Sequence, residues 1–225
     1  MGSLAMALLA VALLGGPGDA PQAGPDLCLL MRGAGTGPVT PELSSVRDLL
    51  AAGDAAGAVG AFRDKATRLE AEAQKLFFDS EGSDPAPARA FMDGQVNGKD
   101  GLLAIRGDRF TLRPDVAAYG AFLSCRAGDG GFGLALLKSG WRDYAEPGFR
   151  TDAVFLMAAL GKWDEAGGFL PENTAGERET LALGLLACHA GKATEGKASL
   201  VKALETLTDL SVRGVARQLL DGCGK

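Results

Sequence analysis

Apolar positions recur at helical spacing along most of this chain, and three of the apolar stretches end in a glycine turn. The three stretches cover residues 119–129, 153–166 and 181–192. Their turn glycines are Gly128, Gly161 and Gly191, which lie 33 and then 30 residues apart. Steps of this size are typical of stacked helix pairs, because one pair cannot bury its own apolar face whereas a stack can. The pattern therefore predicts an all-α fold built as a helix-hairpin repeat stack (an α-solenoid).

The C-terminal half is expected to be helical throughout. Seven helices are predicted, near residues 114–127, 131–139, 150–160, 163–170, 176–190, 193–207 and 210–221. Short connections at the turn glycines favour antiparallel helix pairs. The last predicted helix places Arg213 and Arg217 between its apolar positions, which suits a cap with a polar outer face.

The N-terminal half contains one further predicted helix pair. Thr40 followed by Pro41 is typical of a helix start, with an N-cap residue and then proline at the first helical position. The first helix should end near Ala52, and after a turn at Gly53 the second should cover residues 55–78. Its charged positions are expected to do no more than keep the surface soluble.

Residues 79–113 interrupt this pattern and are predicted to form an irregular insertion. A short helix is expected over 88–92, and a small β-hairpin over 102–112. The tripeptide Arg106-Gly107-Asp108 is an adhesion motif in some extracellular proteins, but a tight turn between two strands explains it fully. A lone hairpin is marginal in water, so this one should lean on helices.

The first residues are typical of a targeting segment. Leu4 to Leu14 form an unbroken apolar run with a small-residue flank, although no basic residue precedes Arg32. We therefore assign residues 1–23 to a signal peptide and predict an exported protein, periplasmic or extracellular. If the apolar run is instead a helix docked on the body, the protein is cytoplasmic. Residues 24–40 follow as a linker, expected to be loosely packed, and residues 41–225 as the helical repeat domain.

The amino-acid composition favours a helical fold and excludes some classes of partner. Apolar residues make up 47% of the 225 residues and aromatic ones 6%, a balance that suits closely packed helices better than a β-sandwich. The net charge of −5 argues against a nucleic-acid partner, which requires a basic stripe. No apolar run reaches the roughly 20 residues of a membrane span, so none is expected in the mature chain.

The four cysteines give no metal or redox motif, because none belongs to a C-x-x-C pair. Disulfides are possible after export. Cys125 and Cys188 hold equivalent places two repeats apart, too far for a bond, whereas Cys188 and Cys223 are better placed. Buried free thiols are favoured over any single pairing.

At residues 161–166, Gly-Lys-Trp-Asp-Glu-Ala, the chain resembles the turn of a tetratricopeptide repeat. Weaker matches lie at residues 183–204, with Gly184, Gly191 and Gly196, and at residues 53–62, with Ala58. Small residues at such places let two helices approach closely. The resemblance implies a divergent stack of such repeats over about 41–78 and 114–221.

The resemblance also implies a concave groove lined by the first helix of each pair. The residues placed there are Phe122, Arg126, Phe155, Leu185 and His189. An apolar strip with one arginine and one histidine at its side would suit an extended peptide carrying an acidic group. The alternative, that the large apolar residues belong to the core, stays open.

No catalytic, metal or cofactor site is predicted. His189 is the only histidine, and its neighbour Cys188 points about 100° away on the same helix. The leading hypothesis is an exported, non-enzymatic protein that binds a protein or peptide partner in its groove. Two alternatives remain: an accessory or lytic-type envelope enzyme on a helical solenoid, and a structural spacer whose concave face is filled by its own N-terminal segment.

Overall fold

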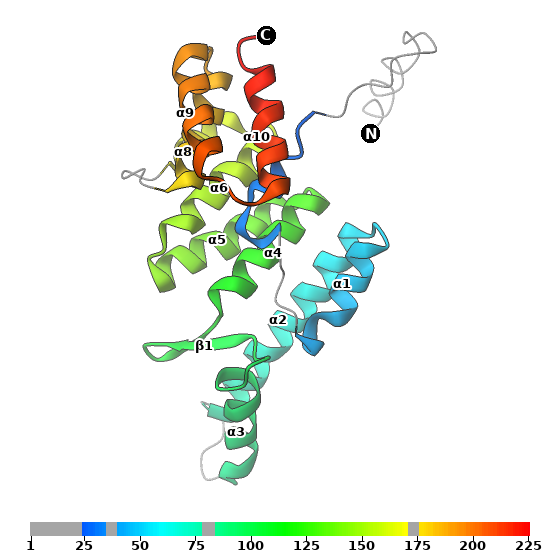
Figure 1. Ribbon diagram of the computed structural model, residues 1–225. Coiled ribbons are helices and arrows are strands. Elements are labelled where there is room, and N and C mark those ends of the chain that lie inside the picture. Colours follow the sequence, from blue (N-terminus) through cyan, green and yellow to red (C-terminus); the bar gives the residue numbers. More distant parts are fainter. Residues whose placement is uncertain (1–23, 35–39, 78–83, 171–175) are drawn as a thin grey trace, which may run out of the picture.

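The computed structural model describes residues 24–34, 40–77, 84–170 and 176–225. Within these ranges the chain forms ten α-helices and one two-stranded antiparallel hairpin, stacked into an elongated body (Figure 1). The predicted all-α stack with a small β-hairpin is therefore confirmed. The predicted signal peptide, residues 1–23, lies outside the described residues.

The N-terminal elements are η1 (Leu27–Leu30), η2 (Arg32–Ala34), η3 (Pro41–Leu43), α1 (Ser44–Ala51), α2 (Ala55–Phe77), α3 (Pro85–Phe91), the π-helical turn η4 (Met92–Val96), β1 (Leu103–Arg106) and β2 (Arg109–Leu112). The C-terminal elements are α4 (Pro114–Ala127), α5 (Gly130–Tyr144), α6 (Pro147–Ala159), α7 (Trp163–Gly167), α8 (Glu177–His189), α9 (Ala193–Thr206) and α10 (Leu210–Gly222).

The glycine turns share one backbone geometry. Gly53, Gly128, Gly161 and Gly191 all adopt the left-handed conformation, with φ of 82°, 73°, 72° and 76°. After each glycine, the next residue donates its backbone N–H to a carbonyl five positions earlier, at 2.8–2.9 Å. This is the Schellman ending of a helix, which a residue with a Cβ adopts only at a cost. The turn glycines that mark the sequence pattern thus share one backbone turn.

Small residues bring α8 and α9 together as expected. A Cβ on Gly184 would lie 2.8 Å from Cγ of Leu200, and a Cβ on Gly196 would lie 2.4 Å from Sγ of Cys188. Real Cβ atoms do not approach that closely, so larger residues would force the helices apart.

The predicted hairpin is confirmed, and it packs against helices as expected. Leu103 pairs with Leu112, and the chain turns at Gly107, where φ is 62°. The hydroxyl of Tyr144 donates to the Leu112 carbonyl at 2.8 Å, which ties the hairpin to α5. On its other side, Phe110 packs against the rings of Phe77 and Phe91.

Several helix boundaries differ from the predicted ones. The helix expected over 88–92 begins earlier, because Asp84 accepts a hydrogen bond from the Ala86 N–H and Pro85 occupies the first turn. It then continues as the π-helical turn to Val96. α5 runs past the predicted end at 139, and α7 ends at Gly167 rather than near 170.

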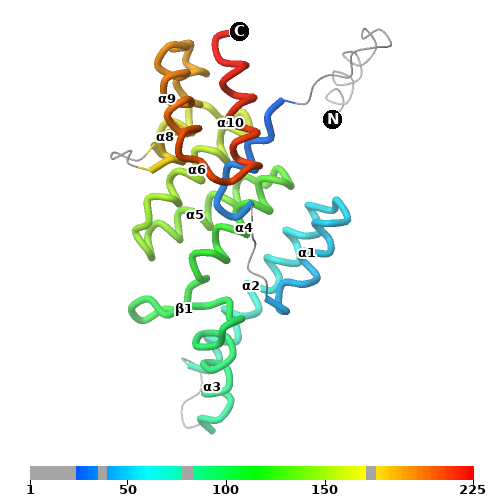
Figure 2. The backbone as a smooth tube through the Cα atoms, viewed as in Figure 1, coloured from blue at the N-terminus to red at the C-terminus, as the bar shows by residue number. Residues whose placement is uncertain are grey.

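The prediction of a loosely packed linker is wrong for its described part. Residues 24–34, here called the strap, pack against α4, α6 and α10 (Figure 2). Leu30 and Met31 are fully buried. Gly33 lies so close to α4 that a Cβ there would be 2.4 Å from the Ala118 carbonyl oxygen. Burial of the apolar run Leu27–Met31 outweighs the glycine and proline content of the segment as a whole.

Among the residues that the structure describes, none of the helices has the length and apolar character that crossing a membrane requires.

Candidate functional site

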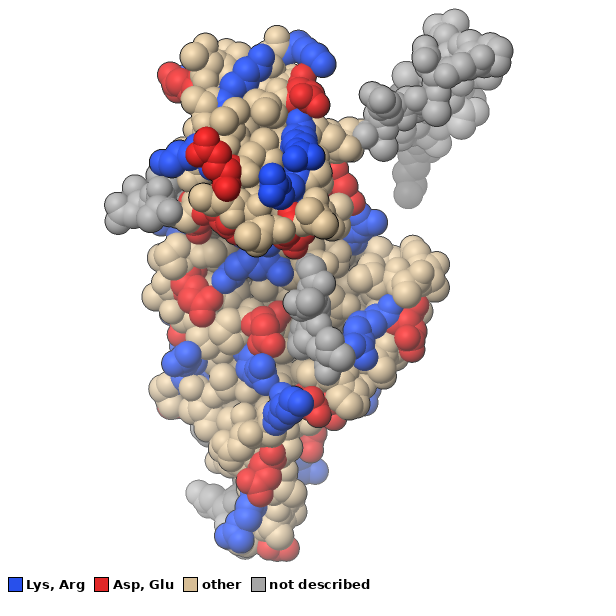
Figure 3. Space-filling view, viewed as in Figure 1, with Lys and Arg blue, Asp and Glu red and all other residues tan. Residues whose placement is uncertain are grey.

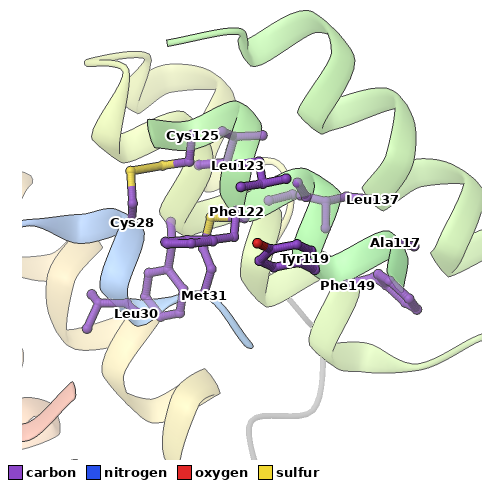
Figure 4. Packing of buried hydrophobic residues seen from close by; sticks show 14 of the residues in the cluster. Cys28, Leu30, Met31, Ala117, Tyr119, Phe122, Leu123, Cys125, Leu137 and Phe149 are labelled. Carbon is purple, nitrogen blue, oxygen red and sulfur yellow. A yellow bond between two sulfur atoms is a disulfide. The ribbon is translucent and has the colours of Figure 1, made fainter. Parts of the chain in front are cut away.

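Three of the five predicted groove residues are buried beneath the strap or in the core around it. Phe122, Phe155 and Leu185 are 6%, 0% and 3% exposed. In Figure 4 the side chains of Leu30 and Met31 lie beside Phe122 on α4. For these three residues the structure supports the core interpretation, so Phe122 and Phe155 offer no open surface to a partner.

The strap is bonded covalently to α4. Cys28 and Cys125 form a disulfide with their Cα atoms 5.8 Å apart, visible in Figure 4. The next residue of α4, Arg126, forms an ion pair with Asp26 of the strap. Arg126 is therefore engaged within the chain rather than by a partner. The expectation of free thiols is wrong, because all four cysteines are in described segments and all are paired.

A buried carboxylate on α6 holds the other end of the strap. Asp152 accepts hydrogen bonds from the backbone N–H of Arg32 at 3.0 Å and from its Nε at 2.8 Å. The same guanidinium donates to Glu146 at 3.0 Å and stacks over the Phe149 ring, 4.4 Å from its centroid. Complete burial raises the pKa of Asp152, although the Arg32 guanidinium beside it acts in the opposite direction.

A main-chain contact completes the seating of the strap. Arg178, on α8, donates to the backbone carbonyl of Leu30. The surface formed by α4, α6, α8 and α10 thus holds a short apolar segment by side-chain burial, by one hydrogen bond to its backbone and by ionic contacts at both ends. A peptide groove uses the same three kinds of contact.

His189, the last of the five predicted residues, lies with Leu185 at the beginning of the strap. A hollow of about 240 Å³ opens there, here called the Trp163 hollow. It is lined by Pro25, Trp163, Leu185, Cys188, His189, Gln218, Leu219, Gly222 and Cys223. The rings of Trp163 and His189 stack with their centroids 3.9 Å apart and their planes inclined by 11°. Because Pro25 forms part of the wall, the hollow adjoins the beginning of the strap.

One wall of the Trp163 hollow is fixed by the second disulfide. Cys188 on α8 and Cys223 at the end of α10 are bonded, with their Cα atoms 5.2 Å apart. This confirms the pairing that the sequence favoured over Cys125 with Cys188. The bond joins the last two helical layers, so the hollow cannot widen by their separation.

Sequence reasoning missed Trp163 and Leu219 as lining residues. Trp163 is the aromatic residue of the Gly-Lys-Trp-Asp-Glu-Ala turn, so the sequence predicted that it follows a helix turn but did not indicate its partner across the hollow. Leu219 belongs to the capping helix, and its packing partner depends on how α10 returns over α8.

Charges do not gather into one field on the face shown in Figure 3, where acidic and basic side chains alternate. Among the described residues, no group of three or more His, Cys, Asp or Glu side chains is arranged to hold a metal ion. Comparison with protein-family models, curated proteins and solved structures gives no match to this chain.

Proposed function

We propose that the protein is a non-catalytic helical-repeat scaffold that binds an extended apolar segment of a partner protein in the Trp163 hollow. The observation that carries the proposal is the strap itself. Its run Leu27–Met31 is buried against α4, α6 and α10, and Arg178 donates a hydrogen bond to the backbone carbonyl of Leu30. A partner segment of similar chemistry, placed end to end with the strap, would enter the hollow beside Pro25.

The lining of the hollow supports such a ligand. Trp163 and His189 present a flat stacked pair, and Leu219 adds an aliphatic wall. Buried aromatic residues supply most of the binding energy in many interfaces. Gln218 provides an amide that can donate to and accept from a peptide backbone. The proposal retains Leu185 and His189 from the predicted groove and moves the binding position away from Phe122 and Phe155.

We also infer an oxidising compartment for this activity. All four cysteines, each inside a described segment, are disulfide-bonded. Such bonds persist in secreted and periplasmic proteins and are rare in the cytosol. The disulfides therefore favour the exported alternative over the cytoplasmic one. Mass spectrometry of the mature protein from its native cell measures both the first residue and the number of free thiols.

A structural spacer is the second candidate, because the strap already occupies a surface formed by α4, α6 and α10. In that case the chain itself is the ligand of this surface. The enzyme alternative gains less support, because Asp152, whose pKa is raised by burial, is bonded to Arg32 and is not available to a substrate.

Panning a random peptide library displayed on phage against the oxidised full chain separates these candidates. We expect enrichment of peptides with two or more large apolar residues. Trp163→Ala together with Leu219→Asp should weaken the selected peptides by roughly 30-fold, since removing an aromatic anchor costs about 2 kcal/mol or more. Val201→Asp, on an exposed position of α9, is the matched control. Failure to enrich any peptide, or equal binding to the double variant, would favour the spacer.

A further inference from the structure

A second hollow lies between α5, α6 and the residues that follow α7. Its volume is about 190 Å³. It is lined by Leu137, Lys138, Trp141, Phe149, Arg150, Ala153, Gly168 and Phe169, here called the basic-aromatic hollow. It shares no residue with the Trp163 hollow, and the proposed function makes no use of it.

Three aromatic rings define the apolar part of this hollow. Phe149 is fully buried and forms its inner wall, whereas Trp141 is 38% exposed at the rim. Phe169 contributes the third ring. A tryptophan that remains this exposed beside two other rings leaves an aromatic surface uncovered, and such surfaces commonly mark ligand sites.

Two cations of the lining lie against these rings, besides Arg32 of the strap, which stacks over Phe149 from outside the lining. The Arg150 guanidinium carbon is 5.6 Å from the Trp141 ring centroid, and Lys138 Nζ is 5.8 Å from that of Phe169. Arg150 donates from Nη2 to the Leu170 carbonyl at 3.1 Å, which fixes the guanidinium in place. Within the described ranges, neither cation forms an ion pair, and the lining contains no carboxylate.

We propose that the basic-aromatic hollow binds a small aromatic carboxylate. The ligand ring would pack among Trp141, Phe149 and Phe169, and its carboxylate would accept hydrogen bonds from Arg150 and Lys138. Both cations are opposite in charge to a carboxylate, and an arginine can bind a carboxylate with two parallel N–H donors. The volume is below the roughly 300–1,000 Å³ of pockets for drug-sized ligands, so a single ring with one acidic group fits better than a nucleotide or a lipid chain.

The test uses phenylacetate and its neutral analogue phenylacetamide. The chain has two tryptophans, so Trp163→Phe leaves Trp141 as the only indole reporter. We expect phenylacetate to change the Trp141 emission saturably within about 10 mM, and phenylacetamide to bind at least about 10-fold more weakly. Equilibrium dialysis of radiolabelled phenylacetate against the unaltered chain provides a measurement free of the substitution.

Two pairs of variants complete the design. Lys138→Met with Arg150→Met should lower the affinity for phenylacetate at least about 10-fold, because both charge partners are lost. Lys202→Met with Arg217→Met removes the same charge from exposed positions outside the hollow and should leave binding unchanged. Arg150→Gln serves if the first pair fails to give the native circular dichroism. Equal binding of acid and amide, no binding at all, or unchanged binding to a folded Lys138 and Arg150 variant would overturn the proposal.

Discussion

Arg32 and Asp152 are linked twice, once through the backbone N–H of Arg32 and once through its Nε. The two bonds fix both the path of the strap and the direction of one of its side chains. They join residues 120 positions apart in the sequence. A single aspartate on α6 therefore fixes the Arg32 end of the strap.

Arg32→Met should destabilise the protein by about 3–5 kcal/mol at neutral pH, because it leaves the Asp152 carboxylate buried without its partner. Burial already raises the pKa of Asp152, and losing Arg32 raises it further. With a folded pKa above the unfolded one, the folded state takes up the proton first, so the loss should shrink as the pH falls from 7 towards 4. Urea unfolding at several pH values measures the difference in unfolding free energy between the wild type and Arg32→Met. Arg217→Met is the control, and an equal effect of both changes would contradict the prediction.

Asp143→Asn should show the opposite pH dependence. The hydrogen bonds from Arg142 lower the pKa of Asp143 against the effect of its burial, and Ser139 and Arg109 add to the lowering. The ionised Asp143 side chain contributes about 1 kcal/mol or less to the free energy of unfolding. This contribution is fully present above the ordinary aspartate pKa of 3.8, and it is lost as the pH falls through the lowered pKa that Asp143 has in the folded protein. The stability difference between wild type and Asp143→Asn should be constant near pH 7 and disappear in strong acid. A difference that grows on acidification would refute this assignment.

The two disulfides should contribute differently. Cys28 and Cys125 are 97 residues apart, and Cys188 and Cys223 are 35 apart. By chain entropy, replacing the first pair with alanine costs about 4.7 kcal/mol and replacing the second about 3.8 kcal/mol. Only the first change should speed hydrogen exchange at the strap amides. If both double variants leave strap exchange equally slow, the disulfide is not what holds the strap.

Alanine at the turn glycines should cost about 1–2 kcal/mol per site, because each has φ above 70°. The test compares thermal unfolding of Gly128→Ala, Gly161→Ala and Gly191→Ala. Gly60→Ala is the matched control, since it lies inside α2 with open space around its Cα, and it should stabilise by about 0.4–1 kcal/mol. A stabilising effect at Gly161 would show that its left-handed turn carries no strain for a side chain.

The helical stack could be predicted from the sequence because each of its helices and turns is specified by residues that are close together in the chain. Gly128, Gly161 and Gly191 each end an apolar stretch, and the same backbone turn follows at each. Helix spacing made Cys188 with Cys223 a better placed pair than Cys125 with Cys188, but it did not predict that either bond forms. The hairpin followed from two short apolar runs on either side of Arg106-Gly107-Asp108.

The strap could not be predicted in the same way, because its contacts span about half of the chain. The apolar run Leu27–Met31 lies between polar, glycine-rich and proline-rich residues, so average composition over 24–40 indicated a linker. Nothing local to Cys28 indicates Cys125 as its partner. The groove residues Phe122 and Phe155 were placed on the correct helices, but whether a groove stays open depends on which remote segment fills it.

Because Arg32 is synthesised before Asp152, the contact between them forms only after a delay. At about 5–20 residues per second, the ribosome needs roughly 6–24 s to produce the residues that separate them. Cys28 has no disulfide partner until Cys125 has been made, and Arg32 has no buried carboxylate to bind until Asp152 has been made. The strap therefore stays without its covalent bond and its ionic contact with α6 while the residues between them are synthesised.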